Sequence, residues 1–529
     1  MANRYWVGGT DTWDDSAGLK WALTSGGVGG QLAPTTADTV FFDAASGANT
    51  ITIGAGAVGL SLTTTGFTGT IAFGTNKISL AGNAITVFTG AATYTVTGTP
   101  LIELTYAGST GTRTITASAI SEANVVSLNV VAGTDAITTT NTASLKNLNF
   151  TGFAGTLNGN TRTIYGNLTI STGMTVTAGT SATTFAATSG TQQITTNGKA
   201  LDFPITQSGV GGTVQLQDNL TMGSTRTYTL TAGTLDLNNR TLTTAIFSSN
   251  NTNVRSIAFG TGQINITFNG GTIWFLSTLA GFSYTGTPTV NCTYAGATGT
   301  RTIQHGNTSG GSEANAISFY VTAGTDTFSY SGNTRFKNLD FTGFSGSAYV
   351  GQGSFIYGNL NISSTTTILA SASLLTFAST SAGNTITSAG KTLDFPITFN
   401  GIGGTWAFQD ALAQGSTRAF TITNGTVQLK NGATSTVGNF VTSGTNQKFL
   451  QSITPGSQAT LTQASGTVNA SYLTIKDINA TGGAEWNAFV NQANIDAGNV
   501  DGWNFGISPV VGGAEYTYSM RSFTQPRRF

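Results

Sequence analysis

The sequence predicts an all-β fold, an elongated parallel β-solenoid (β-helix). Short bursts of alternating apolar and polar residues recur along the chain, whereas the 3.6-residue periodicity of helices is almost absent. Segments of the first half also recur in the second half at a spacing of about 190 residues. Stacked coils of such a repeat bury one continuous core. A string of β-sandwiches is the alternative, but it requires separate cores joined by linkers, and no linker-like change of composition occurs.

The recurrence indicates a tandem duplication, because several segments repeat in the same order with only small insertions and deletions. The matching pairs are Thr105–Ile115 with Thr293–Ile303, Lys146–Phe153 with Lys337–Phe344, Leu201–Thr206 with Leu393–Thr398, and Gly223–Arg226 with Gly415–Arg418. Within each copy, successive strand-like bursts mostly lie roughly 15–20 residues apart, and Gly, Asn and Thr-Gly turns fall between them. We therefore predict solenoid copy 1 at 46–245 and solenoid copy 2 at 246–439.

The two ends of the chain differ from the middle, as the terminal coils of a solenoid should. Residues 1–45 contain three of the seven tryptophans and are interpreted as an N-terminal cap or attachment unit. Residues 440–505 begin as a partial third copy and end in a C-terminal cap. Residues 506–529 combine arginines, aromatic residues and two prolines, a composition typical of an extended arm that docks on a neighbour. The predicted assembly-interface residues are Tyr516, Tyr518, Arg521, Phe523, Arg527, Arg528 and Phe529.

Composition excludes several functional classes. The 529 residues include 21 Lys+Arg and 21 Asp+Glu, so the formal net charge is zero and no basic footprint for nucleic acid exists. The single cysteine, Cys292, excludes an intramolecular disulfide and a Cys-based metal cluster. The single histidine, His305, argues against a Ser-His-Asp triad. We expect no cofactor, no metal, no membrane insertion and no secretory signal at the N-terminus.

The chain carries a resemblance in its opening and closing segments. Trp6-Val7-Gly8-Gly9, followed by Trp13, Trp21, Pro34 and Asp38–Asp43, resembles the opening unit of β-solenoid adhesins and passenger domains. Together with the tandem middle, the segments Ser471–Asp477, Gly502–Phe505 and Arg521–Phe529 resemble structural proteins of tailed, especially marine, bacteriophages. This resemblance covers nearly the whole chain. It implies a fibre, spike or appendage role on a virion and implies no particular catalytic residue.

Glycan-cleaving spikes share this fold, so paired carboxylates were sought. A glycosidase needs two carboxylates about 5–9.5 Å apart. Four acidic positions recur in both copies, and recurrence indicates a structural role in turns or coils. These positions are Glu122/Glu313, Asp135/Asp326, Asp202/Asp394 and Asp218/Asp410. Three carboxylates are copy-specific but lie far apart in the sequence: Glu103, Asp236 and Asp340. We therefore predict no catalytic residue.

Other charged and polar positions are interpreted as structural. The recurring cations are predicted to be solvated edge charges, and recognition of an acidic glycan is the alternative; they are Arg113/Arg301, Arg226/Arg418, Lys146/Lys337 and Lys199/Lys391. The aspartates in the Ala-Gly-Thr-Asp turns are predicted to cap local backbone N–H groups. His305 is expected in an exposed loop. The segment Asn494–Gly502 is interpreted as a turn, although its oxygen-bearing side chains suggest a calcium loop as an alternative.

Two tryptophans in the middle of the chain, Trp274 and Trp406, are copy-specific, since Trp406 stands where copy 1 has Val214. Aromatic side chains provide platforms for recognition. The two residues are therefore candidate glycan-binding positions, and core filling is the alternative interpretation.

These observations predict a non-catalytic structural protein of a virion, a fibre or spike subunit that can also contact a host-surface glycan. The expected partners are other virion proteins and further copies of the same chain, and the expected location is the virion. Two alternatives remain open: a tailspike depolymerase on the same fold, and a bacterial surface adhesin.

Overall fold

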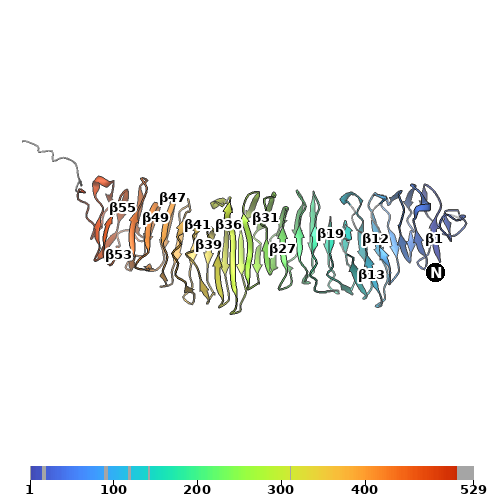
Figure 1. Cartoon of the computed structure of the whole chain (residues 1–529), viewed down its shortest axis with the longest axis horizontal. Helices are drawn as coiled ribbons and strands as arrows, with labels where there is room; N and C mark the ends of the chain where they lie inside the picture. Colours follow the sequence, from blue (N-terminus) through green and yellow to red (C-terminus); the bar gives the residue numbers. More distant parts are fainter. Residues whose placement is uncertain are drawn as a thin grey trace, which may run out of the picture.

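The computed structural model describes residues 2–14, 19–87, 93–116, 121–140, 143–309 and 311–508. It is an all-β parallel β-solenoid of about 20 coils with essentially no helices, which confirms the predicted fold class. Figure 1 shows a single elongated rod in which the coils follow one another in chain order from the blue N-terminal end to the red C-terminal end. Consecutive coils in the sequence are therefore neighbours in space.

Three long sheets form most of the walls of the rod. A coil contributes strands to different walls; β25, β26 and β27 follow one another in the chain and belong to three different long sheets. The first sheet contains β6 (Val58–Gly59), β9 (Ile78–Leu80), β12 (Leu101–Leu104), β14 (Ser127–Val130), β17 (Leu148–Asn149), β20 (Leu168–Thr169), β23 (Thr191–Thr195), β25 (Thr213–Leu216), β28 (Gly233–Asp236), β31 (Arg255–Gly260) and β34 (Phe282–Gly286). The second contains β16 (Ala143–Leu145), β19 (Arg162–Ile164), β22 (Thr183–Phe185), β24 (Ile205–Gln207), β27 (Thr227–Leu230), β30 (Ile246–Ser248), β33 (Gly271–Thr278), β36 (Thr300–Ser309), β38 (Thr327–Tyr330), β40 (Ser347–Ala348) and β43 (Thr367–Ile368). The third contains β26 (Leu220–Thr221), β29 (Thr241–Thr244), β32 (Gln263–Ile266), β35 (Thr289–Cys292), β37 (Ile317–Val321), β39 (Arg335–Asp340), β41 (Ser354–Ile356), β42 (Leu360–Asn361), β44 (Leu375–Phe377), β45 (Asn384–Thr387), β47 (Ile397–Phe408), β49 (Ala419–Leu429), β51 (Asn439–Thr442), β52 (Lys448–Ser452), β55 (Leu473–Lys476) and β58 (Ile495–Asp496).

Shorter sheets complete the walls. In the described part of the chain, four single-turn 3-10 segments lie between strands. The sheets contain β1 (Asn3–Trp6), β3 (Trp21–Ala22), β4 (Thr39–Phe41) and β7 (Ser61–Thr63); β2 (Asp11–Trp13), β5 (Thr50–Ile53), β8 (Thr70–Ala72) and β11 (Thr95–Thr97); β10 (Thr86–Val87), β13 (Thr112–Ile115), β15 (Ala136–Thr139), β18 (Thr156–Leu157) and β21 (Thr175–Val176); β46 (Thr392–Leu393), β48 (Ala413–Gln414), β50 (Thr434–Thr436), β53 (Ala459–Gln463) and β56 (Ile478–Gly482); and β54 (Thr467–Asn469) and β57 (Glu485–Asn487). The 3-10 segments are η1 (Ala44–Ser46), η2 (Glu122–Asn124), η3 (Glu313–Asn315) and η4 (Val490–Gln492).

The alternating sequence pattern sets the side-chain directions in every wall. In β12 and β14, Ile102 and Leu104 pair in parallel register with Leu128 and Val130, and all four side chains are buried. The polar residues between them face outward. The buried residues form a single hydrophobic cluster that extends from Trp6 to Ala488. One core therefore runs through the rod, as stacked coils require.

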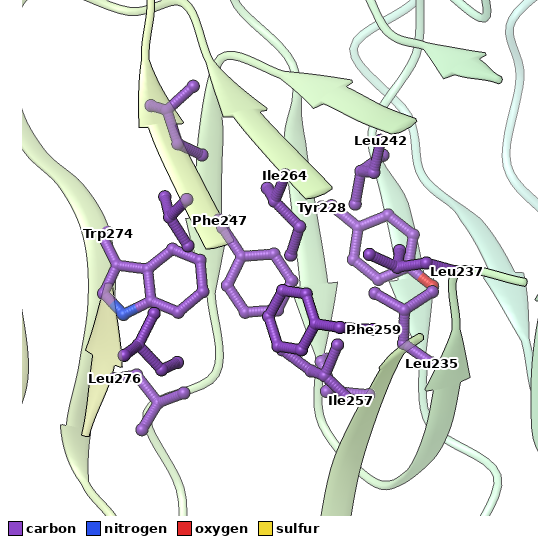
Figure 2. Packing of buried hydrophobic residues seen from close by; sticks show 14 of the residues in the cluster. Tyr228, Leu235, Leu237, Leu242, Phe247, Ile257, Phe259, Ile264, Trp274 and Leu276 are labelled. Carbon is purple, nitrogen blue, oxygen red and sulfur yellow. The ribbon is translucent and has the colours of Figure 1, made fainter. Parts of the chain in front are cut away.

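Aromatic residues on successive coils form stacked ladders inside this core. Tyr228, Phe247 and Trp274 occupy matching register positions on β27, β30 and β33, and Figure 2 shows their rings side by side. The ring centroids are 6.0 Å apart for Tyr228 and Phe247, and 4.6 Å apart for Phe247 and Trp274. Parallel in-register stacking thus brings side chains about 20–27 residues apart in the sequence into direct contact.

Both ends of the described rod contain aromatic clusters. Trp6, Trp13 and Trp21 are at most 1% exposed and surround Phe42; Trp6 and Trp13 pack edge to face against its ring, and Trp21 is stacked on it. β1 and β3 pair antiparallel at this end, whereas the other strand pairs of the described chain are parallel. At the other end, the ring centroids of Trp486 and Trp503 lie 4.9 Å apart.

Candidate functional site

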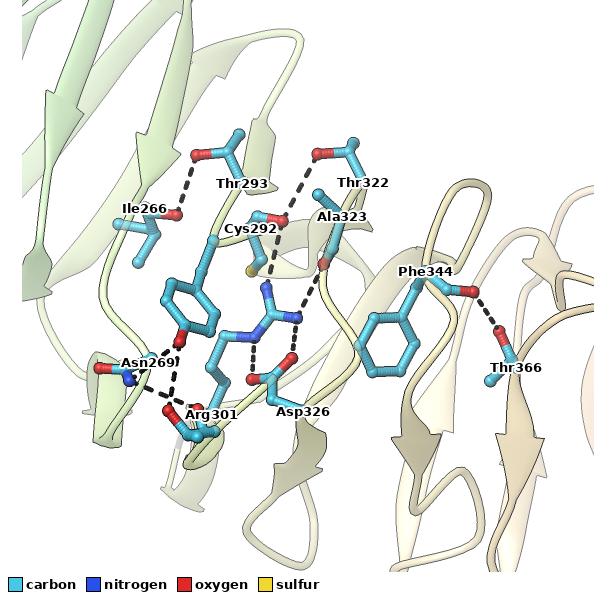
Figure 3. A network of polar contacts seen from close by, with 12 residues as sticks. Ile266, Asn269, Cys292, Thr293, Arg301, Thr322, Ala323, Asp326, Phe344 and Thr366 are labelled. Carbon is cyan, nitrogen blue, oxygen red and sulfur yellow. Dashed lines mark hydrogen bonds and ion pairs between the residues drawn. The ribbon is translucent and has the colours of Figure 1, made fainter. Parts of the chain in front are cut away.

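Two buried ion pairs occupy equivalent places in the two halves of the rod. The guanidinium of Arg301 on β36 donates from Nε and Nη2 to the two carboxylate oxygens of Asp326, at 2.8 and 2.7 Å, and Arg113 binds Asp135 in the same way. All four side chains are fully buried. Figure 3 shows Arg301 also donating to the carbonyls of Cys292 and Ala323. The predictions of solvated arginines here, and of aspartates that cap their own turns, were therefore wrong.

Glycines in the Ala-Gly-Thr-Asp turns make these ion pairs possible. Gly133 and Gly324 both have φ of 104°, a backbone conformation that favours glycine. A Cβ at either position would lie 2.7 Å from arginine Nη2 and from aspartate Oδ1. The turn therefore brings its backbone against the guanidinium and at the same time directs the aspartate inward. Each arginine also lies over a phenylalanine ring, Phe153 or Phe344.

His305 and Trp274, the two copy-specific residues singled out separately in the sequence, contact each other in the core. His305 is fully buried, so the expectation of an exposed loop histidine was wrong. Its Nε2 lies 2.8 Å from the carbonyl of Asn315, and the indole N–H of Trp274 lies 3.4 Å from Nδ1. A carbonyl accepts from Nε2–H and an indole donates to Nδ1, which together identify the neutral Nε2–H tautomer. Burial lowers the pKa of His305 to about 4, although the Asn315 carbonyl acts in the opposite direction.

The structure places both candidate glycan-binding tryptophans in the core. Trp274 and Trp406 are 0% exposed, and a stacking platform needs an exposed ring face. Trp406 packs against Phe377 and Phe399 and against the backbone of Gly404. These contacts agree with the core-filling interpretation, and neither ring can bind a sugar in this conformation.

The recurring acidic residues act as acceptors for groups on other coils. The carboxylate of Glu313 on η3 accepts from the backbone N–H and Oγ1 of Thr380, at 3.0 and 2.8 Å, and Glu122 on η2 makes the same contacts with Thr188. The outer carboxylates Asp218 and Asp410 accept from the backbone N–H groups of Thr196 and Ser388. Asp202 and Asp394 bind the partly exposed Arg226 and Arg418 at 2.7 Å. Lys146 and Lys337 are exposed, and Lys199 and Lys391 are half-buried.

The three copy-specific carboxylates do not come together. Glu103 binds Lys77 at 2.6 Å, and Asp236 accepts from Nε2 of Gln215 at 2.8 Å. Five strands separate β12 from β28 in their sheet, so Glu103 and Asp236 lie roughly 30 Å apart at the usual strand spacing. Asp340 lies on β39 in a different sheet. No two of these residues have the separation that glycoside hydrolysis requires.

A polar groove of about 340 Å³ crosses β12, β14, β17 and β20. Its asparagine side chains bind the neighbouring coils: Nδ2 of Asn147 donates to Oγ of Ser127 at 2.9 Å, and Oδ1 of Asn147 accepts from the backbone N–H of Asn167 at 2.7 Å. These hydrogen bonds support the coil stack.

The Asn494–Gly502 segment is a structured turn in which Asn494 is buried and donates to the carbonyls of Ala470 and Phe489. Oδ2 of Asp501 accepts from Gln458, and Oδ1 of Asp477 accepts from Asn499. In the described chain, no group of three or more His, Cys, Asp or Glu side chains could hold a metal ion. No helix of the described residues has the length and apolar character that crossing a membrane requires.

The sequence pattern did not lead us to predict two fully buried cations that form no ion pair with a carboxylate of the described residues. Arg162 on β19 and Lys448 on β52 are 0% exposed, and their donors bind backbone carbonyls. Their inward position in an alternating pattern was the available signal. The proposed interface residues, Tyr516, Tyr518, Arg521, Phe523, Arg527, Arg528 and Phe529, lie outside the described residues.

Comparisons of the chain with protein-family models, with curated proteins and with solved structures found no match.

Proposed function

We propose that this chain is a structural protein of a virion, a non-catalytic subunit of a fibre or spike whose shaft is the solenoid. The observation that carries the proposal is the single core from Trp6 to Ala488. A rod whose coils share one core resists bending between parts, and this property suits a shaft that holds two objects at a fixed distance. The resemblance to phage structural proteins supplies the virion context.

The distribution of polar groups supports a non-catalytic role. The recurring carboxylates bind arginines or backbone N–H groups, and Glu103 and Asp236 are roughly 30 Å apart. In this account the two solenoid copies form the shaft, and the aromatic clusters around Trp13 and Trp486 act as end caps that block stacking with other chains. The outer faces, which are rich in threonine and asparagine, remain available for contact with other virion proteins, with further copies of the chain and with host-surface glycans.

Fractionation of particles tests the proposal. Phage particles purified on a density gradient are analysed by mass spectrometry, and antibodies against residues 46–439 are used for immunogold labelling. We expect the chain in the particle fraction and gold on a projecting appendage. Recovery only in the host envelope would instead identify an adhesin, and recovery only in the soluble lysate would contradict the proposal.

A cleavage assay tests the non-catalytic part. Incubation of the purified chain with host capsule or lipopolysaccharide is expected to release no oligosaccharide. Release that is abolished by Glu103→Gln or Asp236→Asn would identify the chain as a depolymerase.

A further inference from the structure

A surface notch of about 520 Å³ lies on copy 1, where the turns that precede β19 and β22 meet the side chain of Arg226, which precedes β27. We call it the Asn158 notch; it is lined by 158–160, by 177–181 and by Arg226. Its volume falls within the roughly 300–1,000 Å³ of small-molecule sites. The lining offers amide, hydroxyl and guanidinium groups and no aromatic ring. Such a surface suits a ligand that carries hydroxyl groups and charge.

A buried cation lies directly behind this notch. Arg162 is fully buried; its Nη2 donates to the carbonyl of Asn158 at 2.9 Å and its Nε donates to the carbonyl of Asn160 at 3.1 Å. Its Nη1 has no hydrogen-bond partner among the described residues. Unlike Arg113 and Arg301, Arg162 forms no ion pair with a carboxylate of the described residues. An uncompensated charge in a low-dielectric interior acts strongly on groups nearby.

The same hydrogen bonds orient the backbone of the notch. In a trans peptide the N–H points opposite to the carbonyl, and the described chain contains no cis peptide. Because the carbonyls of Asn158 and Asn160 point toward Arg162, the N–H groups of Gly159 and Thr161 point away from the guanidinium. The N–H of Asn160, between them, donates to the carbonyl of Asn158 at 2.9 Å. These bonds fix the backbone of the turn at the notch.

The corresponding region of copy 2 has the same surface ion pair but lacks the buried arginine. Arg226 in the notch binds Asp202, and Arg418 binds Asp394 in copy 2 at the same 2.7 Å. The register position of Arg162 is taken by Ser354 in copy 2, where the hydroxyl of Tyr330 donates to the carbonyl of Val350. Copy 1 therefore has one net positive charge at this place, whereas the corresponding groups of copy 2 have none.

We infer that the Asn158 notch binds the anionic group of an acidic saccharide, a carboxylate or a sulfate ester. Arg226 contacts the anion, the buried charge of Arg162 attracts it electrostatically, and the asparagine, threonine and serine side chains of the lining contact the sugar hydroxyls. This inference deepens the host-surface contact of the proposed function and rests on it.

Calorimetric titration of the purified full-length chain tests the site without particles. The probes are oligogalacturonate, a sulfated carrageenan oligosaccharide, a neutral maltooligosaccharide and inorganic sulfate. We expect at least one acidic saccharide to bind, with about tenfold weaker affinity in Arg226→Gln, because one charge-assisted contact is lost. The matched Arg418→Gln variant breaks the equivalent ion pair of copy 2 and is expected to bind like the unmodified chain.

A second variant, Arg162→Met, removes the buried charge without altering a residue that lines the notch. We expect weaker binding of the acidic saccharide while circular dichroism still reports a folded shaft; if Arg162→Met does not fold, the Arg226 and Arg418 pair decides. Equal affinities of Arg226→Gln and Arg418→Gln, equal binding of the neutral probe, binding of sulfate alone, or no binding of either acidic probe would overturn the inference. The particle assay is independent of these outcomes, so the two proposals can fail separately.

Discussion

At equivalent positions, the two copies fill the interior with different side chains. Trp274 and His305 contact each other in copy 2, and Arg162 in copy 1 is matched by Ser354 with Tyr330 nearby. Trp274 and His305 satisfy each other's buried polar atoms, and an unsatisfied buried polar group is costly. Arg162 is only partly satisfied, because its Nε and Nη2 bind backbone carbonyls while its Nη1 has no partner among the described residues.

The buried His305 makes stability depend on pH. The histidine pKa is about 6.5 in an unfolded chain, whereas burial lowers it to about 4 in the folded protein. Between these values the unfolded state binds more protons, so this residue's contribution is complete above pH 6.5 and is lost as the pH falls toward 4; it amounts to ~3 kcal/mol. Urea denaturation should therefore show a smaller loss of stability between pH 7 and pH 4.5 in His305→Gln. Parallel pH profiles of the two proteins would contradict the buried neutral state.

The buried ion pairs predict a large contrast between acidic residues. Asp326→Asn leaves Arg301 buried without a counter-ion and should lower the free energy of unfolding by about 3–5 kcal/mol. Glu103→Gln breaks the surface pair with Lys77 and should cost only about 0–1 kcal/mol. Urea denaturation measures both variants. Similar costs would show that the Arg301–Asp326 pair is not desolvated in solution.

At the scale of elements, the 3-10 segments connect coils that are not neighbours in the stack. Glu313 and Glu122 reach residues 67 and 66 positions further along the chain. Their carboxylates therefore fix loops across several coils, beyond the contacts between adjacent strands.

This bridging predicts a local effect on hydrogen exchange. Glu313→Gln removes a charged acceptor from the N–H of Thr380, and the exchange of that amide should become about 10–100 times faster, since such bonds contribute about 1.5–3 kcal/mol. Glu122→Gln provides the reciprocal control, because it should accelerate Thr188 and leave Thr380 unchanged. Mass spectrometry of peptides that contain these threonines measures both. Unchanged exchange at Thr380 in Glu313→Gln would contradict the contact.

Strand pattern and repeats were predictable from the sequence because each depends on local spacing. Alternation predicted the strands, in which residues such as Ile102 and Leu128 point inward, and the duplication predicted equivalent segments in the same order. Partners about 20–30 residues apart in the sequence were not predictable, since they depend on how many residues each coil contains. The burial of Arg301 and His305 was missed for this reason: Asp326 and Trp274 approach them only when successive coils stack in register.

In the whole molecule, the shaft and the proposed attachment residues are separate parts of the chain. The coils and aromatic clusters lie within residues 3–505, and the proposed interface residues follow them in the sequence. Assembly and stability of the shaft should therefore respond to different changes.

Deletion of residues 506–529 tests this separation. The thermal unfolding of the shaft should change little, because the core formed by the described residues extends from Trp6 to Ala488. Oligomerisation, measured by analytical ultracentrifugation, and incorporation into particles should be lost, because arginine and aromatic side chains are typical interface anchors. A truncated chain that still assembles normally would show that these residues are dispensable.

Small-angle X-ray scattering of the purified chain tests the central claim, a single continuous rod, most directly. About 20 stacked coils at ~4.8 Å each give a shaft about 100 Å long. We expect an elongated particle of this length with a constant cross-section and no flexible joint. A compact profile, or the profile of separate domains moving about linkers, would contradict it.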